Sequence, residues 1–311
     1  MQTHQPTSRI TNGNVYQPLF DINMYYQKHK NRRLQGQEKL TWTIKVAMRF
    51  GFVSAIVCAK VWQTSRAKTL EFLNKLVEMG LLQVAKTIRA ADGRVYVLTY
   101  TGAQYARELT QIDFPFRSAP EPISQLNQNA IMHDCILSLV LSLGMQNSNT
   151  DGTPNPLWQA YLTELEFKRL YPSNEVKNVD ALVLLNNNDV AAIEIEHSFK
   201  RKQQHEQSIL KFKTALLANQ AGINAGANNG DGNADGVGSN KLYDKVFLVV
   251  TSAKIQQDTQ RFYDQLLSEM PNRYDKKTKQ PLLTELDAAF LKANIVIRTK
   301  FISEIRELFY S

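Results

Sequence analysis

The 311-residue chain contains only two cysteines, and this shortage excludes two common ways of stabilising a protein. Cys58 and Cys135 each lie in an apolar stretch with helical spacing, far apart in the sequence. A disulfide framework needs several pairs of cysteines, and a cysteine-based zinc site needs closely spaced ones. We therefore expect two buried free thiols in a protein that works in the reducing cytoplasm.

Long hydrophobic runs are missing as well. No apolar run reaches the roughly 18 residues that a membrane-spanning helix needs, and the polar N-terminus lacks the pattern of a signal peptide. We expect a soluble cytoplasmic protein without a membrane partner. Hydrophobic residues make up 43% and charged residues 21% of the chain, which are values typical of globular proteins. A chain of 311 residues is long enough for two domains, each with its own core.

Positive charge is concentrated in the N-terminal third of the chain. Residues 1–110 contain 16 lysines and arginines against 6 acids, whereas the remainder contains 21 against 23. A basic module joined to a nearly neutral domain is typical of proteins that bind nucleic acid. The alternative is a solvated basic face that has no partner.

The order of elements in this basic third predicts a winged helix-turn-helix over residues 38–112. Apolar residues recur at helical spacing in three segments, residues 38–50, 54–62 and 65–79. Two β-rich runs follow, and the Asp-Gly pair between them at positions 92 and 93 is a strong hairpin signal. In such domains the third helix enters the major groove of DNA, and the hairpin, or wing, meets the backbone. The alternative is a winged helix that binds protein.

The winged-helix prediction assigns DNA contacts to side chains in three segments. Those at the start of the third helix, which face the groove, are Thr64, Ser65, Arg66, Lys68 and Thr69. Those on the wing, which meet phosphates, are Lys86, Arg89 and Arg94. The segment before this domain, residues 1–37, is expected to be a basic, flexible arm along DNA or a solvated tail. Its candidate DNA contacts are Lys28, Lys30, Arg32 and Arg33.

A second domain is expected after a proline-rich linker at residues 113–123. Residues 124–311 predict a helix, three strands, a helix, a strand, a helix, a strand and a terminal helix, with the first strand at residues 161–171. This order indicates an α/β domain, in a protein that is α+β overall, with helices on both faces of a mixed sheet. The Gly/Asn-rich residues 219–240 are expected to form a flexible insertion.

Three acidic residues lie on two apolar runs of this second domain that otherwise have the pattern of buried strands. Asp180 lies in residues 179–185, and Glu194 and Glu196 lie in residues 190–196. Side chains alternate along a strand, so the two glutamates share one face. Buried, unpaired carboxylates are costly unless a cation holds them, and a hard ion such as Mg²⁺ or Mn²⁺ takes oxygen ligands. The alternative is a solvated acidic strand end.

The order of these elements, with an Asp early in the second strand and acids in the third, resembles the PD-(D/E)XK, or restriction-endonuclease-like, nuclease fold. The winged helix, the helix segment Ile131-Met132-His133-Asp134-Cys135-Ile136 and the strands with Asp180 and Glu194 together resemble the replication-relaxation family and the MobC-type relaxases. The resemblance covers residues 38–310 in element order. It implies a role in plasmid mobilisation and conjugation, as a nuclease that nicks duplex DNA at a plasmid transfer or replication origin, with relaxosome and coupling proteins as partners.

The resemblance assigns metal binding to Asp180 and Glu194, and it also falls on His133, for which a core histidine is the alternative. The lysine expected two positions after Glu194 is replaced by Glu196, which is then a candidate for a second metal ligand or a base. Two lysines of the following helix can substitute for the missing one, Lys200 and Lys211. The alternative is that both lysines are solvated.

Together these patterns predict a metal-dependent DNA endonuclease that binds a specific site and nicks one strand. The main alternative is a non-catalytic, DNA-binding replication or transcription regulator with a degenerate nuclease fold that has lost its lysine. A third possibility is an endonuclease of defence or repair, which would cut both strands.

Overall fold

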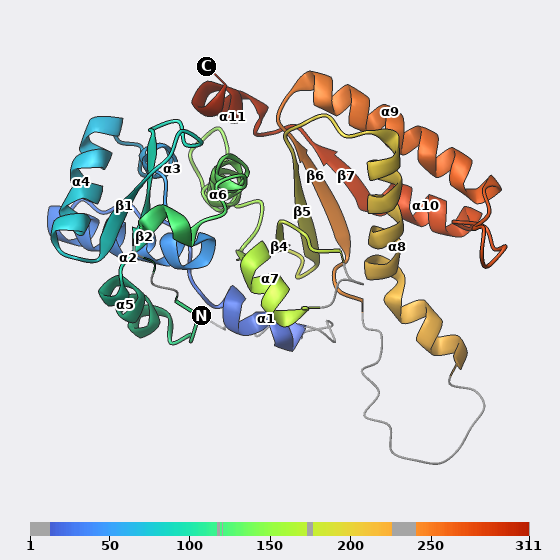
Figure 1. Cartoon of the computed structure of the whole chain (residues 1–311), viewed down its shortest axis with the longest axis horizontal. Helices are drawn as coiled ribbons and strands as arrows, with labels where there is room; N and C mark the ends of the chain where they lie inside the picture. The colour runs from blue at the N-terminus through green and yellow to red at the C-terminus, as the bar shows by residue number, and fades with distance from the viewer. Residues whose placement is uncertain (1–12, 117–118, 120, 173–176, 226–240, 311) are drawn as a thin grey trace, which may run out of the picture. The chain divides into compact units, whose positions relative to one another are not determined.

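The computed structural model describes residues 13–116, 119, 121–172, 177–225 and 241–310. The chain forms two compact units, each of which contains helices and strands (Figure 1). The N-terminal unit comprises Phe20–Glu166 and Ser303–Ser311, and the C-terminal unit comprises Met1–Leu19 and Phe167–Ile302. None of the helices in the described ranges is long and apolar enough to cross a membrane.

The N-terminal unit contains three helices and a two-stranded antiparallel sheet in the predicted order. These elements are α2 (Arg32–Phe50), α3 (Ala55–Trp62), α4 (Arg66–Glu78), β1 (Leu82–Lys86) and β2 (Arg94–Leu98), and α5 (Tyr100–Thr110) follows them. The hairpin connection ends at Gly93, whose φ of 67° lies in the left-handed region that favours glycine. The Asp-Gly signal therefore identified the hairpin correctly.

Local sequence signals set the ends of these helices. The side chain of Asn31 accepts hydrogen bonds from the first amides of α2, and that of Ser65 accepts one from Lys68 N at the start of α4. Gly51 ends α2 with a left-handed φ of 79°. Capping side chains satisfy amides that have no partner inside the helix. The sequence predicted the end of α2 before Gly51 and the start of α4 at Ser65, whereas the first helix was expected to begin at Glu38 and α2 begins earlier, at Arg32.

The segment before α2 packs into the N-terminal unit, which corrects the expectation of a flexible arm over residues 1–37. Tyr26 is buried, with its ring 6.2 Å from that of Trp42 and 6.3 Å from that of Trp62. Trp42 Nε1 also donates a hydrogen bond of 3.1 Å to the backbone of this segment. Burial of large aromatic rings outweighs the polar character of the surrounding residues. Residues 1–12 lie outside the described part of the chain.

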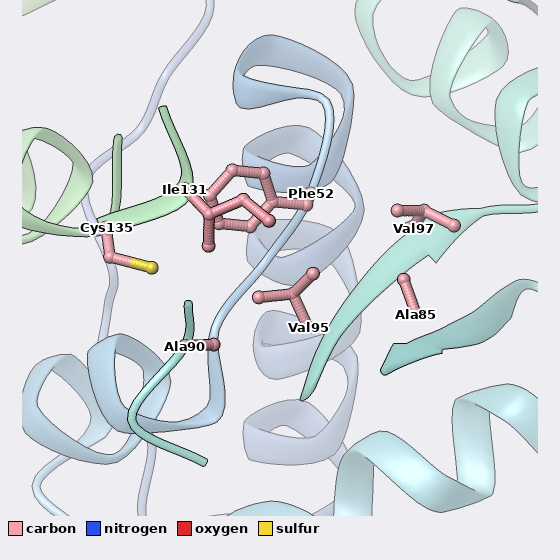
Figure 2. Close-up of a cluster of buried hydrophobic side chains, with 7 residues drawn as sticks. All are labelled: Phe52, Ala85, Ala90, Val95, Val97, Ile131 and Cys135. Carbon is pink, nitrogen blue, oxygen red and sulfur yellow. The ribbon is translucent and has the colours of Figure 1, made fainter. Parts of the chain in front are cut away.

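A hydrophobic cluster joins the hairpin to helix α6 (Ile131–Met145) within the N-terminal unit (Figure 2). Its buried members are Phe52, Ala85, Ala90, Val95, Val97, Ile131 and Cys135. Removing these side chains from water is favourable in proportion to the apolar area buried, so α6 packs with the hairpin. Helix α6 and the preceding 3-10 helix η1 (Pro122–Gln125) thus belong to the first unit. The boundary between the units does not fall at residues 113–123, where the prolines placed it.

A buried ion pair anchors the end of the N-terminal unit. Arg49 donates hydrogen bonds of 2.9 and 2.8 Å to the two carboxylate oxygens of Glu166, and one of 2.5 Å to Tyr161 O. Glu166 also accepts a hydrogen bond of 2.7 Å from the amide of Thr163, in the geometry of a helix capping box. Strand β3 (Ala160–Thr163) therefore stops there and α7 (Glu164–Leu170) begins. The expected strand over residues 161–171 is wrong after Thr163, where α7 begins.

The C-terminal unit contains a mixed sheet flanked by helices. Its strands lie in the order β4 (Ala181–Leu184), β5 (Val190–Glu196), β6 (Lys245–Val250) and β7 (Ile295–Arg298). The first pair is antiparallel, whereas the β5–β6 and β6–β7 pairs are parallel. Three helices cover one face of this sheet (Figure 1), namely α8 (Lys202–Ala225), α9 (Ala253–Glu269) and α10 (Glu285–Asn294). The unit also contains most of α1 (Gly13–Phe20) and the 3-10 helix η2 (Met270–Asn272), and the chain ends with α11 (Ile302–Phe309).

Two helices of this unit differ from the expectation. Helix α8 runs to Ala225, so the expected insertion at residues 219–240 begins later, and residues 226–240 lie outside the described part. Helix α10 was not predicted. It begins at a capping box in which Thr284 accepts from the amide of Asp287 and Asp287 accepts from the amide of Thr284. This box starts the helix directly after a turn-rich stretch, which masks the short helical pattern.

Candidate functional site

The acidic residues of the C-terminal unit lie side by side at one end of the β4–β5 pair. Strand β5 is buried along its whole length, and Glu194 and Glu196 are only 4% and 3% exposed. The register pairs Ala181 with Ile193, so Asp180, one residue earlier, lies opposite Glu194. Asp180 also accepts a hydrogen bond of 2.7 Å from the amide of Ile195. The strand pairing therefore brings Asp180 and Glu194 together, as the sequence pattern required.

Two lysines contact these buried acids. Lys200 Nζ lies 2.8 Å from Glu196 Oε1, so the lysine proposed as a substitute does reach back to the strand. Lys177 Nζ lies 2.7 Å from Glu194 Oε2, and sequence reasoning missed this residue. Lys177 lies three residues before Asp180, outside any helix or strand, so no helical or strand pattern in the sequence points to it. Its only signal was its closeness in sequence to the predicted start of an acid-bearing strand.

Each glutamate has one carboxylate oxygen without a partner. Glu194 Oε1 and Glu196 Oε2 are buried and accept no hydrogen bond from any residue that the structure describes. Burial, and next the charge of Asp180, raise the pKa of Glu194 from 4.5 to about 8, although Lys177 opposes this shift. A further cation beside Glu194 would favour the ionised form of this carboxyl group and lower its pKa.

A pocket of about 460 Å³ opens in front of these acids, and we call it the lysine pocket. Its lining includes Lys177, Lys200, Gln204, Gln207, Ser208 and Lys211. Lys177 and Lys200 contact the buried acids and also line the pocket, so the acids lie close to the space where a ligand fits. Lys211 lies on the same face of α8 as the two glutamines, as predicted from its spacing. Three ammonium groups and the side-chain amides of Asn178, Gln204 and Gln207 suit an anionic, hydrogen-bonding group such as a phosphate.

The acids do not form a ready three-ligand metal site. Among the residues described, no three His, Cys, Asp or Glu side chains are grouped so as to hold a metal ion. Glu194 and Glu196 each contact one lysine, and Asp180 and Glu194 are the pair directly opposite each other on adjacent strands. The expected His133 belongs to the N-terminal unit, where its Nδ1 lies 3.0 Å from Asp134 Oδ1. Metal binding by the three carboxylates stays a prediction.

The predicted groove-facing residues divide into structural and exposed ones. Ser65 caps α4, and Thr64 Oγ1 lies 2.9 Å from Oγ1 of the buried Thr69, so these three hold the turn between α3 and α4. Arg66 is half-exposed and forms an ion pair with Asp92 in the hairpin connection. Lys68 is exposed. The contacts expected from Thr64 and Thr69 therefore serve the fold, whereas Lys68 is open to a ligand.

The remaining basic candidates are exposed in the N-terminal unit. On the hairpin these are Lys86, Arg89 and Arg94, and at the start of α2 they are Lys30, Arg32 and Arg33. Lys28 donates a hydrogen bond to the side chain of Gln63, the residue that ends α3. Since α4 begins three residues after Gln63, the basic segment lies beside the predicted groove-facing helix. Cations from three separate segments thus come to the surface of one unit.

No known protein family, curated protein or solved structure matches the chain.

The raised pKa of Glu194 is directly measurable. In a carbon-13 titration of the glutamate carboxyl groups, the resonance lost in Glu194→Gln should have a midpoint near 8. Lys177→Met should move this midpoint higher, because it removes the ammonium that favours the ionised carboxylate. Lys202→Met is the matched control, since its ammonium pairs with Glu269 instead. A wild-type midpoint at the ordinary value of 4.5 would show that burial does not control this group.

Proposed function

We propose that the chain is a metal-dependent DNA endonuclease that binds duplex DNA through its N-terminal unit and nicks one strand with its C-terminal unit. The observation that carries this proposal is the pairing of Asp180 and Glu194 on adjacent strands behind a lysine-lined pocket. An acid pair that binds a cation, next to cations that bind a phosphate, is what phosphodiester hydrolysis needs.

Two architectural features support the proposed folds. In the N-terminal unit, three helices and a hairpin in this order favour a winged helix-turn-helix with α4 facing the major groove. In the C-terminal unit, the antiparallel β4–β5 pair carries the acids, and α8 and the parallel strand β6 follow it. This arrangement favours a restriction-endonuclease-like fold, which the acid spacing already resembles.

Asp180 and Glu194 are the residues that would hold Mg²⁺ or Mn²⁺. Glu194 Oε1 is buried and accepts no hydrogen bond within the described chain, and both residues offer the hard oxygen atoms that these ions prefer. Mg²⁺ is commonly held by only one or two carboxylates, with water and substrate phosphate completing its shell, so two ligands fit. When bound, such an ion would supply Lewis-acid stabilisation of the charge that develops on the phosphate.

Lys177 takes the role of the lysine that Glu196 replaces. Its ammonium contacts Glu194 and lines the pocket, so it is close both to the acid pair and to a phosphate bound in the pocket. Lys200, just before α8, and Lys211, within α8, add positive charge to the pocket. Water attacks the phosphorus, the bond to one sugar oxygen breaks, and the lysines stabilise the added negative charge on the phosphate oxygens.

A non-catalytic DNA-binding regulator is the second candidate, and one observation favours it. Each buried glutamate already has a lysine partner, at 2.7 and 2.8 Å, so the cluster is compensated without an ion. On this reading, the two lysine–glutamate pairs stabilise the fold, and the acids no longer bind a metal ion. A plasmid transfer or replication origin as the target, and relaxosome and coupling proteins as partners, stay expectations of the resemblance. A cytoplasmic location stays an expectation from the composition of the sequence.

Nicking of supercoiled plasmid tests the catalytic proposal. With Mg²⁺ or Mn²⁺, the wild type should convert supercoiled plasmid carrying its target site to open circles, and EDTA should stop the reaction. Asp180→Ala and Glu194→Ala should lower the rate by at least about 100-fold, since they remove the ion's ligands. Lys177→Ala should lower it by a similar factor, because removing one preorganised charge commonly costs about 100-fold.

The matched control for these variants is Asp264→Ala, an exposed carboxylate on α9 of the same unit. It should nick at the wild-type rate. Binding without a nick in any metal would support the regulator, and linear products would support an enzyme of defence or repair.

Salt-dependent binding tests the N-terminal unit. Lys68→Ala and Arg89→Ala should each weaken binding to duplex DNA of any sequence and reduce the slope of log K against log salt by about 0.9. Lys75→Ala is the control, because this exposed lysine lies at the far end of α4 and pairs with Glu71 at 3.0 Å. An equal loss of DNA affinity in all three variants would contradict the assignment of DNA binding to the surface that carries Lys68 and Arg89.

A further inference from the structure

A second, smaller cavity adjoins the lysine pocket, and the proposed nicking reaction does not use it. This cavity has a volume of about 210 Å³, and we call it the aromatic pocket. Its lining includes Ser198, Phe199, Lys200, His205, Asp258 and Thr259. Lys200 lines both cavities, so a ligand with a phosphate in the lysine pocket has its neighbouring group beside the aromatic pocket.

Phe199 lines this pocket and is unusually exposed for an aromatic side chain. The side chain is 64% exposed although it is large and apolar, and it stands in the connection between β5 and α8, directly before Lys200. Its ring lies 6.2 Å from that of Phe262 in an edge-on arrangement, which holds it in place and leaves a face open. An exposed aromatic face next to a cationic groove is the pattern by which proteins stack nucleic-acid bases.

His205 forms the inner part of the aromatic pocket. It is 3% exposed, and its ring lies 5.5 Å from both Phe262 and Tyr263. Its Nδ1 is buried and has no hydrogen-bond partner among the described residues. Burial lowers the pKa of His205, so the neutral ring offers one donor and one acceptor at neutral pH. Thr259 adds a hydroxyl group to this lining, so the pocket combines an apolar wall with polar side chains.

We propose that the aromatic pocket binds one unpaired nucleobase, whose neighbouring phosphate occupies the lysine pocket. The inference rests on the proposed function for the role of the lysine pocket. The base stacks on Phe199, and its edge meets His205 and Thr259. A base inside a duplex is already stacked and paired, so this site takes a strand that is locally single-stranded. The substrate class is therefore a single strand, or a duplex with an opened segment.

Binding of a short single strand to the full-length protein tests this inference. In EDTA, which prevents cleavage, Phe199→Ala should weaken binding of the single strand about tenfold, because stacking on one aromatic ring carries this much affinity. Phe199→Tyr should bind as the wild type does, since it keeps the ring. Leu286→Ala is the matched control, because Leu286 is another large apolar side chain, 83% exposed in the same unit.

The outcomes separate this inference from the proposed function. Wild-type affinity in Phe199→Ala, or an equal loss in Leu286→Ala, would overturn the base pocket even if the enzyme nicks plasmid. A tenfold loss confined to Phe199→Ala supports the base pocket even if no metal produces a nick, and only the nuclease proposal then fails.

Discussion

The burial of two glutamates on one fully buried strand is the constraint on which the C-terminal unit depends. Glu194 and Glu196 face the same side of β5 and are almost inaccessible to water. An isolated carboxylate in such a place is too costly, so the fold supplies Lys177 and Lys200 and holds Glu194 with a pKa near 8. The pairing of β4 with β5 then places Asp180 beside Glu194, the glutamate whose pKa is raised.

The two units present charge in different ways. Glu194 and Glu196 are buried in the C-terminal unit, and one oxygen of each has no partner among the described residues. Cations of the N-terminal unit, such as Lys68 and Arg89, instead stay exposed, where they suit a long polyanion. On the proposed function, the first unit supplies affinity for DNA and the second supplies chemistry at one phosphate. The lysines that compensate the acids also line the pocket, so one set of residues serves stability and substrate binding.

The sequence predicted those features that depend on short-range signals. The alternation along residues 190–196 located the two glutamates, and capping residues and the Asp-Gly turn located α4 and the hairpin. Features that depend on distant residues were missed. The strand expected at residues 161–171 becomes a helix because Arg49, more than 100 residues earlier, binds Glu166 in the capping position. Lys177 was missed because only the fold brings its ammonium to Glu194.

Calorimetric titration of Mg²⁺ and Mn²⁺ into the full-length protein is the most direct test of this account. Because Glu194 must lose its proton to bind an ion, affinity should rise as the pH passes through about 8. At pH 7, comparison of buffers with different ionisation enthalpies should show that nearly one proton is released for each ion bound. Glu194→Gln should abolish both the binding and the proton release. Absence of binding at pH 7 and pH 9, or binding that survives Glu194→Gln without proton release, would contradict a cation site built on the buried glutamate.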